Sequence, residues 1–143
     1  MGYYISKADG SRIPFAESGE LNFVETITAA KTLKVEDSGK TFILDAAAGA
    51  EITLPALASG LNYRFIVGSA FATTNWTIVS STSVIQGNVL VAGAHVAGSD
   101  ENTISFVATA ESIGDYVNLT SDGTNFYVSG SGVSSGAITL TSV

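Results

Sequence analysis

Cysteine is absent from the 143 residues of this chain, and its absence excludes several kinds of chemistry. The chain forms no disulfide, and it offers no cysteine ligand to zinc or to an iron–sulfur cluster. Thiol catalysis is excluded for the same reason. At this length one domain buries enough surface to fold without such staples. We therefore predict a single domain whose stability comes from packing or from assembly with other chains.

Positive charge is scarce and confined to one part of the chain. The net charge is −7, and charged residues make up 13% of the sequence, against about 25% in a typical soluble domain. No cation follows position 64, because the basic residues are Lys7, Arg12, Lys31, Lys34, Lys40 and Arg64. Nucleic-acid binding requires clustered cations that displace counterions from phosphates. We predict no nucleic-acid partner and a surface that packs against copies or protein partners.

Histidine is almost absent, which leaves little scope for catalysis. A triad-type hydrolase needs a base that titrates near neutral pH, and His95 is the one histidine. Its alternating sequence context favours a surface or subunit-contact role. With one histidine and no cysteine, the common zinc spacings do not occur. We predict a protein that is not an enzyme, with no catalytic, cofactor-binding or metal-binding residues and no cofactor.

Carboxylates keep one enzymatic alternative open. A glycan-cleaving enzyme needs two facing carboxyl groups, and the candidates are Asp100, Glu101, Asp115 and Asp122. All four lie in turn-like sequence, where Asp commonly accepts hydrogen bonds from its own backbone. The Asp100–Asn102 segment offers oxygens to calcium but lacks the spaced acidic pattern of a calcium loop.

Long hydrophobic runs are also missing. No window approaches the ~20 apolar residues that cross a bilayer, so we predict no membrane partner. The N-terminal residues show no basic stretch followed by an apolar run, and we expect no signal peptide.

What the sequence does contain is period-2 alternation interrupted by turns. Residues 62–67 alternate polar and apolar side chains, as a half-buried strand does. Asp122-Gly123 between two alternating segments is a strong hairpin signal. Further strands are expected near residues 41–44, 51–54, 76–79, 84–86, 88–91, 103–107, 116–120, 126–129 and 137–140. Short strands at this regular spacing predict an all-β fold, an antiparallel β-sandwich that is jelly-roll-like or barrel-like.

The two ends of the chain differ from the middle. Residues 1–32 are predicted to form an extended N-terminal arm or the first hairpin of the sandwich, with one short strand at 21–27. Residues 33–143 are predicted to form the sandwich domain. Within it, the Ser/Gly-rich segment 129–136 is expected to be a flexible or extended linker. The final segment, 137–143, is apolar enough to need a pairing partner, in its own sheet or in that of another subunit.

From about Leu33 to Ser129 the chain resembles small phage virion proteins, in particular head decoration (cement) proteins, with related modules in phage fibres. The resemblance covers about two thirds of the chain, and each motif alone is weak. The matching segments are Asp37–Phe42, Thr53–Ala56, Gly60–Val67, Ile85–Gly87, Gly114–Val117 and Ser121–Val128. It implies a β-sandwich that trimerises on the capsid exterior and contacts the major capsid protein. It brings no catalytic residues.

The expected function follows from this resemblance. The protein is predicted to be a non-enzymatic virion protein, made in the host cytoplasm, that decorates the capsid exterior as a homotrimer. Because the N-terminal arm lies outside the resemblance, its role is a separate hypothesis: capsid binding through Tyr3, Tyr4, Lys7, Arg12 and Phe15. The alternative is a carbohydrate- or receptor-binding module of a tail or head fibre, in which Trp76 stacks on a sugar. Aromatic residues at alternating strand positions are more often core residues.

Overall fold

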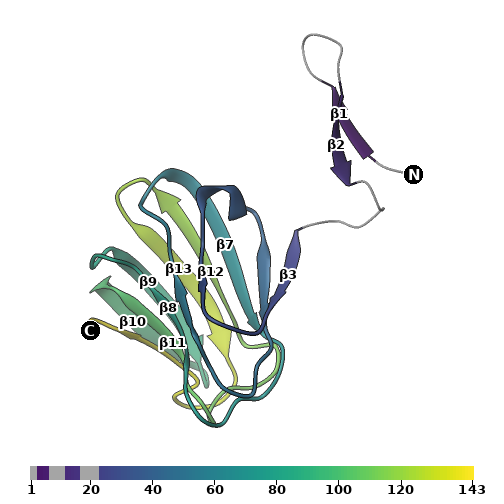
Figure 1. Cartoon of the computed structure of the whole chain (residues 1–143). Helices are drawn as coiled ribbons and strands as arrows, with labels where there is room; N and C mark the ends of the chain where they lie inside the picture. Colours follow the sequence, from purple (N-terminus) through teal and green to yellow (C-terminus); the bar gives the residue numbers. More distant parts are fainter. Residues whose placement is uncertain (1–2, 7–11, 17–22) are drawn as a thin grey trace.

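The structure, a computed structural model, describes residues 3–6, 12–16 and 23–143, and over these it is built from strands in two packed sheets (Figure 1). The seven-stranded sheet has the order β10 (Ala94–Glu101), β9 (Ile85–Val91), β13 (Phe126–Gly132), β12 (Tyr116–Asp122), β7 (Ser59–Val67), β5 (Thr41–Leu44), β3 (Val24–Ile27). The five-stranded sheet has the order β14 (Ile138–Thr141), β11 (Thr103–Phe106), β8 (Trp76–Val79), β6 (Glu51–Thr53), β4 (Lys31–Thr32). The predicted all-β sandwich is confirmed.

The strand directions differ from the antiparallel arrangement that we predicted. From β3 to β8 the chain alternates between the two sheets, so that each return to a sheet runs in the same direction as the previous strand. The pairs β3/β5, β5/β7, β4/β6 and β6/β8 are therefore parallel, and β9/β13 is parallel as well. The remaining pairs in both sheets are antiparallel. Side-chain alternation is the same in both arrangements, so the sequence pattern does not distinguish them.

The core lies between the sheets and follows this alternation. On β7, Leu61, Tyr63 and Phe65 point inward and are at most 2% exposed, whereas Asn62 and Arg64 point outward and are exposed. On the neighbouring strand the ring of Phe42 stacks on that of Phe65, with centroids 5.5 Å apart. Each large apolar side chain buried in this way contributes about 1.5–3 kcal/mol.

Charged side chains close the sandwich at the edge formed by β3 and β4. Glu25 on β3 shares its sheet face with the buried Phe42, so it points toward the core. Its carboxylate pairs with the Nζ of Lys31 on β4 and, at 3.1 Å, with the Nζ of Lys40. Lys40 also binds Asp37 at 2.9 Å, in the short 3-10 turn η1 (Val35–Asp37). Inward-pointing charge at a sheet edge disfavours the addition of another strand.

Two hairpins show what the sequence did and did not reveal. The predicted Asp-Gly turn joins β12 to β13, and Gly123 adopts a φ of +94°. The β9–β10 hairpin was missed. Its two-residue loop, Ala92-Gly93, has positive φ at both positions (+49° and +80°), as a type I′ turn requires. Alanine there gives none of the usual turn signal, and β10 is rich in residues with low strand propensity.

The predictions for the chain ends need correction. Strands β1 (Tyr3–Ser6) and β2 (Arg12–Ala16) pair with each other in a separate two-stranded sheet that is hydrogen-bonded to neither large sheet. The sandwich begins at Val24 rather than at residue 33, because β3 and β4 belong to its sheets. The expected Ser/Gly-rich linker is wrong over residues 129–132, which form part of β13. Strand β14 pairs with β11 of its own sheet, so no exchange between subunits is needed.

Candidate binding surfaces

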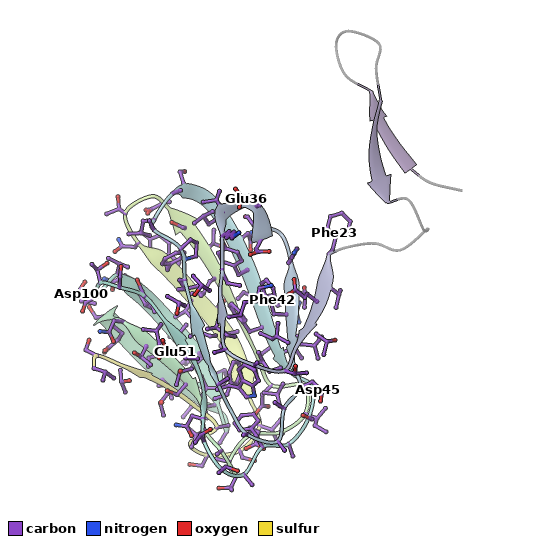
Figure 2. The ribbon with its side chains drawn as sticks, in the orientation of Figure 1. Phe23, Glu36, Phe42, Asp45, Glu51 and Asp100 are labelled. Atoms are coloured by element: carbon purple, nitrogen blue, oxygen red, sulfur yellow. The ribbon has the colours of Figure 1, made fainter. Side chains whose placement is uncertain are left out.

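The two ends of the seven-stranded sheet differ mainly in charge, because apolar side chains are exposed at both, among them Val24 and Val35 at one end and Ile113 and Val133 at the other. The end that we call the charged end carries Glu36 and Asp37 ahead of β5. It also carries Asp100 and Asp122, which lie at the C-terminal ends of β10 and β12. The opposite end, the apolar end, is formed by Leu90, Ile113 and Val133. Figure 2 shows Glu36 and Asp45 at opposite ends of the sandwich. Asp45 is an exposed carboxylate on the apolar side, but it follows β5, three strands away from β13.

The apolar end exposes large side chains on loops that are held in place. Ile113 is 70% exposed and Val133 is 73% exposed. The Asp115 carboxylate, itself 2% exposed, accepts the backbone N–H of Ser112 at 2.9 Å and that of Val133 at 3.0 Å. One buried side chain therefore ties the two loops together.

A row of polar side chains crosses the outer face of the seven-stranded sheet near the charged end. Tyr127 on β13 is opposite Gln86 on β9 and opposite Thr120 on β12, and Thr120 is in turn opposite Asn62 on β7. Asp100 extends the row on β10, because its carboxylate accepts a hydrogen bond from the Gln86 amide. We call these five residues the polar row.

Tyr127 provides the aromatic centre of the polar row. Its side chain is 46% exposed, and its hydroxyl donates a hydrogen bond to Asp122 Oδ2 at 3.0 Å. The other oxygen of Asp122 accepts the backbone N–H groups of Thr124 and Asn125, each at 2.8 Å. These backbone hydrogen bonds, with that from Tyr127, hold the pKa of Asp122 below its ordinary value. The carboxylate is thus charged and fixed, and it fixes the tyrosine.

Backbone irregularities shape the β10 end of the row. Asp100 has a φ of +58° within a β-bulge between Gly98 and Glu101, which turns its side chain toward Gln86. Next to Gln86, Gly87 has a φ of +125°, and a Cβ there would lie 2.4 Å from the carbonyl oxygen of Val128. Bulges and strained residues of this kind often serve to aim a side chain at a binding site.

Amide side chains continue the same face toward the apolar end. Asn118 on β12 lies opposite Arg64 on β7, and the Arg64 guanidinium sits 4.7 Å from the centroid of the Tyr116 ring. His95 is exposed, as predicted for a surface residue, and its Nδ1 lies 3.0 Å from Asn88 Oδ1. The face as a whole is therefore hydrophilic and carries aromatic and planar polar groups.

The outer face of the five-stranded sheet has a shallow groove of about 300 Å³. Glu51 lies on one side and Asn102 on the other. The groove is lined by Glu51, Thr77, Val79, Asn102, Thr103 and Val143. Asn102 is held by hydrogen bonds with Val143 in both directions, at 3.0 Å each.

The sequence-predicted ligand residues fall in different places. Tyr3 and Tyr4 lie on β1, and Arg12 and Phe15 lie on β2. Lys7 lies outside the described residues. Trp76 is fully buried, so the prediction that it stacks on a ligand is corrected: its ring packs inside the sandwich and presents no face to solvent.

The acidic residues considered for catalysis make structural hydrogen bonds. Asp115 and Asp122 accept backbone N–H groups, as their turn-like sequence predicted. In the part of the chain that the structure describes, no three His, Asp or Glu side chains are grouped so as to hold a metal ion. The same residues include no helix long and apolar enough to cross a membrane.

No family model, curated protein or solved structure matches this chain. The polar row and the apolar end were both missed at the level of sequence. The alternation of buried and exposed side chains along β13 indicates only that Tyr127 lies on the opposite face of the strand from Phe126 and Val128. The strand order that brings Gln86 beside it depends on a parallel β9/β13 pair, which no local signal predicts.

Proposed function

We propose that this protein is a non-enzymatic virion structural protein that decorates the exterior of a phage capsid as a homotrimer, with the major capsid protein as its partner. The observation that supports this best is the difference between the two ends of the sandwich. One end exposes Ile113 and Val133 on loops tied by Asp115, and the other gathers charged side chains and is the end where β3 begins.

The charged end is where the N-terminal segment joins the sandwich. Val24 is opposite Thr41 at the start of β5, and the Thr41 N–H donates to the Phe23 carbonyl at 2.7 Å. Residues 1–16 therefore connect to this end. We assign capsid attachment to them, through Tyr3, Tyr4, Lys7, Arg12 and Phe15, because cations can pair with an acidic capsid surface.

The apolar end is the proposed contact between copies. A molecule with a net charge of −7 repels its own copies. Contact through Ile113 and Val133 buries apolar surface and keeps Asp100 and Asp122 of each copy at the far end of the sheet. Trimerisation then multiplies the capsid contacts of each arm through effective concentration.

The alternative, a receptor- or carbohydrate-binding module of a phage fibre, needs a stacking residue other than Trp76. In that role the protein would bind its ligand without capsids, and the N-terminal cations would be dispensable.

The deciding experiment mixes the purified protein with undecorated phage capsids and counts bound copies by sedimentation and cryo-electron microscopy. We expect saturable binding at regular lattice positions. In the Lys7→Ala/Arg12→Ala variant we expect lower occupancy and a weaker dependence on salt, whereas Lys34→Ala, an exposed cation on the sandwich, serves as the control. Occupancy and salt dependence unchanged by the double substitution would refute the assigned attachment, and no binding of the wild type would refute decoration itself.

A further inference from the structure

We propose that the polar row is a binding site for a neutral oligosaccharide. The site consists of Asp100, Gln86, Tyr127, Thr120 and Asn62, with Asp122 supporting the tyrosine. This activity goes beyond capsid attachment and does not depend on it, because the row uses neither the N-terminal strands nor the apolar end.

The shape of the site suits an extended chain molecule. The row crosses the five adjacent strands β10, β9, β13, β12 and β7 at one level. With strands about 4.8 Å apart, it extends over roughly 19 Å on an open sheet face. A linear oligosaccharide laid across the strands would contact each side chain in turn.

Tyr127 supplies the stacking surface at the middle of the row. The electron-rich face of an aromatic ring attracts C–H groups with partial positive charge, such as those on the apolar face of a sugar ring. An exposed tyrosine is normally free to rotate, but the hydrogen bond from its hydroxyl to Asp122 restricts this one. The ring is therefore partly pre-organised, which lowers the entropy cost of binding.

The flanking residues supply the polar contacts. Asn62 and Gln86 each combine a carbonyl acceptor with an amino donor, and Thr120 adds a hydroxyl. Such planar donor–acceptor pairs match the neighbouring hydroxyls of a sugar, each of which both donates and accepts. Asn62 and Thr120 are exposed on the sheet face. At the other end the strained backbone of Asp100 holds its carboxylate beside Gln86.

Charge determines the class of glycan. One end of the row is the carboxylate Asp100, and a second carboxylate, Asp122, lies beside Tyr127. The cation Arg64 on the same face already lies over the ring of Tyr116. Anionic sugars, phosphates and nucleic acids would be repelled. A neutral glycan meets no such repulsion, and its hydroxyls can donate hydrogen bonds to the carboxylates.

The test uses the full chain and a panel of immobilised oligosaccharides that includes neutral hexasaccharides of glucose and of N-acetylglucosamine, and alginate as the anionic comparator. We expect binding to at least one neutral glycan and none to alginate. Tyr127→Ala should weaken that binding about tenfold or more, while Tyr127→Phe, which keeps the ring, should retain most of it. Amide chemical shifts of residues 86, 120 and 127 should move on titration with the bound glycan.

Matched controls separate this site from the rest of the molecule. Val35→Ala changes an exposed apolar side chain (52%) that belongs neither to the polar row nor to the apolar end and should leave glycan binding unaltered. The emission of the buried Trp76 reports whether each variant is folded. The proposal is overturned if no neutral glycan binds at millimolar concentration, if alginate binds better, or if Tyr127→Ala binds as the wild type does. Loss of capsid occupancy in Tyr127→Ala without any glycan binding would assign the row to a protein contact instead.

Discussion

At the scale of single residues, the most unusual side chain is Glu25, a carboxylate that points toward the core. It is tolerated because two cations, Lys31 and Lys40, reach it from different elements. The hydrogen bond from Lys31, with that from Lys40, keeps the pKa of Glu25 below its ordinary value despite burial. Lys31 also lies 5.7 Å from the centroid of the Phe42 ring, so removal of Glu25 would leave its ammonium group against the core without a counter-ion.

We therefore expect Glu25→Gln to destabilise the protein by roughly 1–2 kcal/mol, between the values for exposed and buried ion pairs. The midpoint of urea unfolding measures this loss. Glu36→Gln, an exposed carboxylate without an ion pair among the described contacts, is the matched control and should change the midpoint little. Equal midpoints for both variants would show that the Glu25 pairs contribute nothing.

The backbone near the polar row contains two glycines with positive φ, Gly87 on β9 and Gly93 in the loop that follows. Substitution of each by alanine measures how tightly the backbone is constrained there. A Cβ at Gly87 would lie 2.4 Å from the Val128 carbonyl oxygen, and φ there is +125°. Gly93 also has positive φ (+80°), but nothing lies within 4 Å of its Cβ position. Gly87→Ala should cost roughly 3 kcal/mol and Gly93→Ala about 1 kcal/mol in thermal or urea unfolding. A smaller cost at Gly87 than at Gly93 would contradict the parallel β9/β13 pairing.

At the scale of elements, the edge formed by β3, β4 and η1 is held by groups that titrate at the extremes of pH. Burial acts to raise the pKa of Asp37, but hydrogen bonds from Lys40 and the Lys34 backbone outweigh it and lower that pKa. Lys40 responds in the opposite sense, since its hydrogen bonds to Asp37 and Glu25 raise its pKa. Burial raises the pKa of Tyr63 to about 12, and its hydroxyl donates to the Lys34 carbonyl at 2.9 Å.

These shifts predict the pH range of stability. Lowered carboxylate pKa values give stability that is complete above the ordinary values of 4.5 for Glu25 and 3.8 for Asp37 and is lost as the pH falls below them. The raised pKa of Tyr63 gives stability that is present below pH 10.0 and is lost as the pH rises toward 12. Unfolding midpoints measured from pH 2 to pH 12 should fall at both ends. The Tyr63→Phe variant should be less stable than the wild type at neutral pH, but its stability should fall less between pH 10 and 12. If its stability falls as much as that of the wild type over this range, ionisation of Tyr63 is not the cause of the alkaline loss of stability.

Local patterns predicted the strands well and their partners poorly. Residues 76–79 and 126–129 were identified because apolar and polar side chains alternate there, and Asp122-Gly123 marked its hairpin. The direction of pairing was not readable, because the crossover that makes β5 and β7 parallel is the strand β6 in the other sheet. The polar row depends on that non-local strand order, so its residues could not be grouped from the sequence. Trp76 shows the converse: its place in an alternating strand favoured a core position over ligand stacking, and the side chain is fully buried.

At the scale of the whole molecule, the two ends of the sandwich carry different side chains. Strand β3 begins at the charged end, which carries Glu36, Asp100 and Asp122, while the apolar end displays Ile113 and Val133 on loops tied by Asp115. A protein that assembles gains buried area without bringing its acidic groups together.

The last prediction concerns this assembly. Ile113→Ser/Val133→Ser should convert the proposed trimer into a monomer of 14.6 kDa, measured by light scattering during size-exclusion chromatography. The wild-type unfolding midpoint should rise with protein concentration and that of the double variant should not, because assembly stabilises the folded state by mass action. At concentrations low enough to dissociate the wild type the two midpoints should nearly agree, since both side chains are at least 70% exposed on the single chain. The matched control is Val35→Ser, which removes an exposed apolar side chain (52%) at the charged end and should leave the mass unaltered. If the double variant keeps the wild-type mass, the copies meet through another surface, and the apolar end becomes available to the capsid protein.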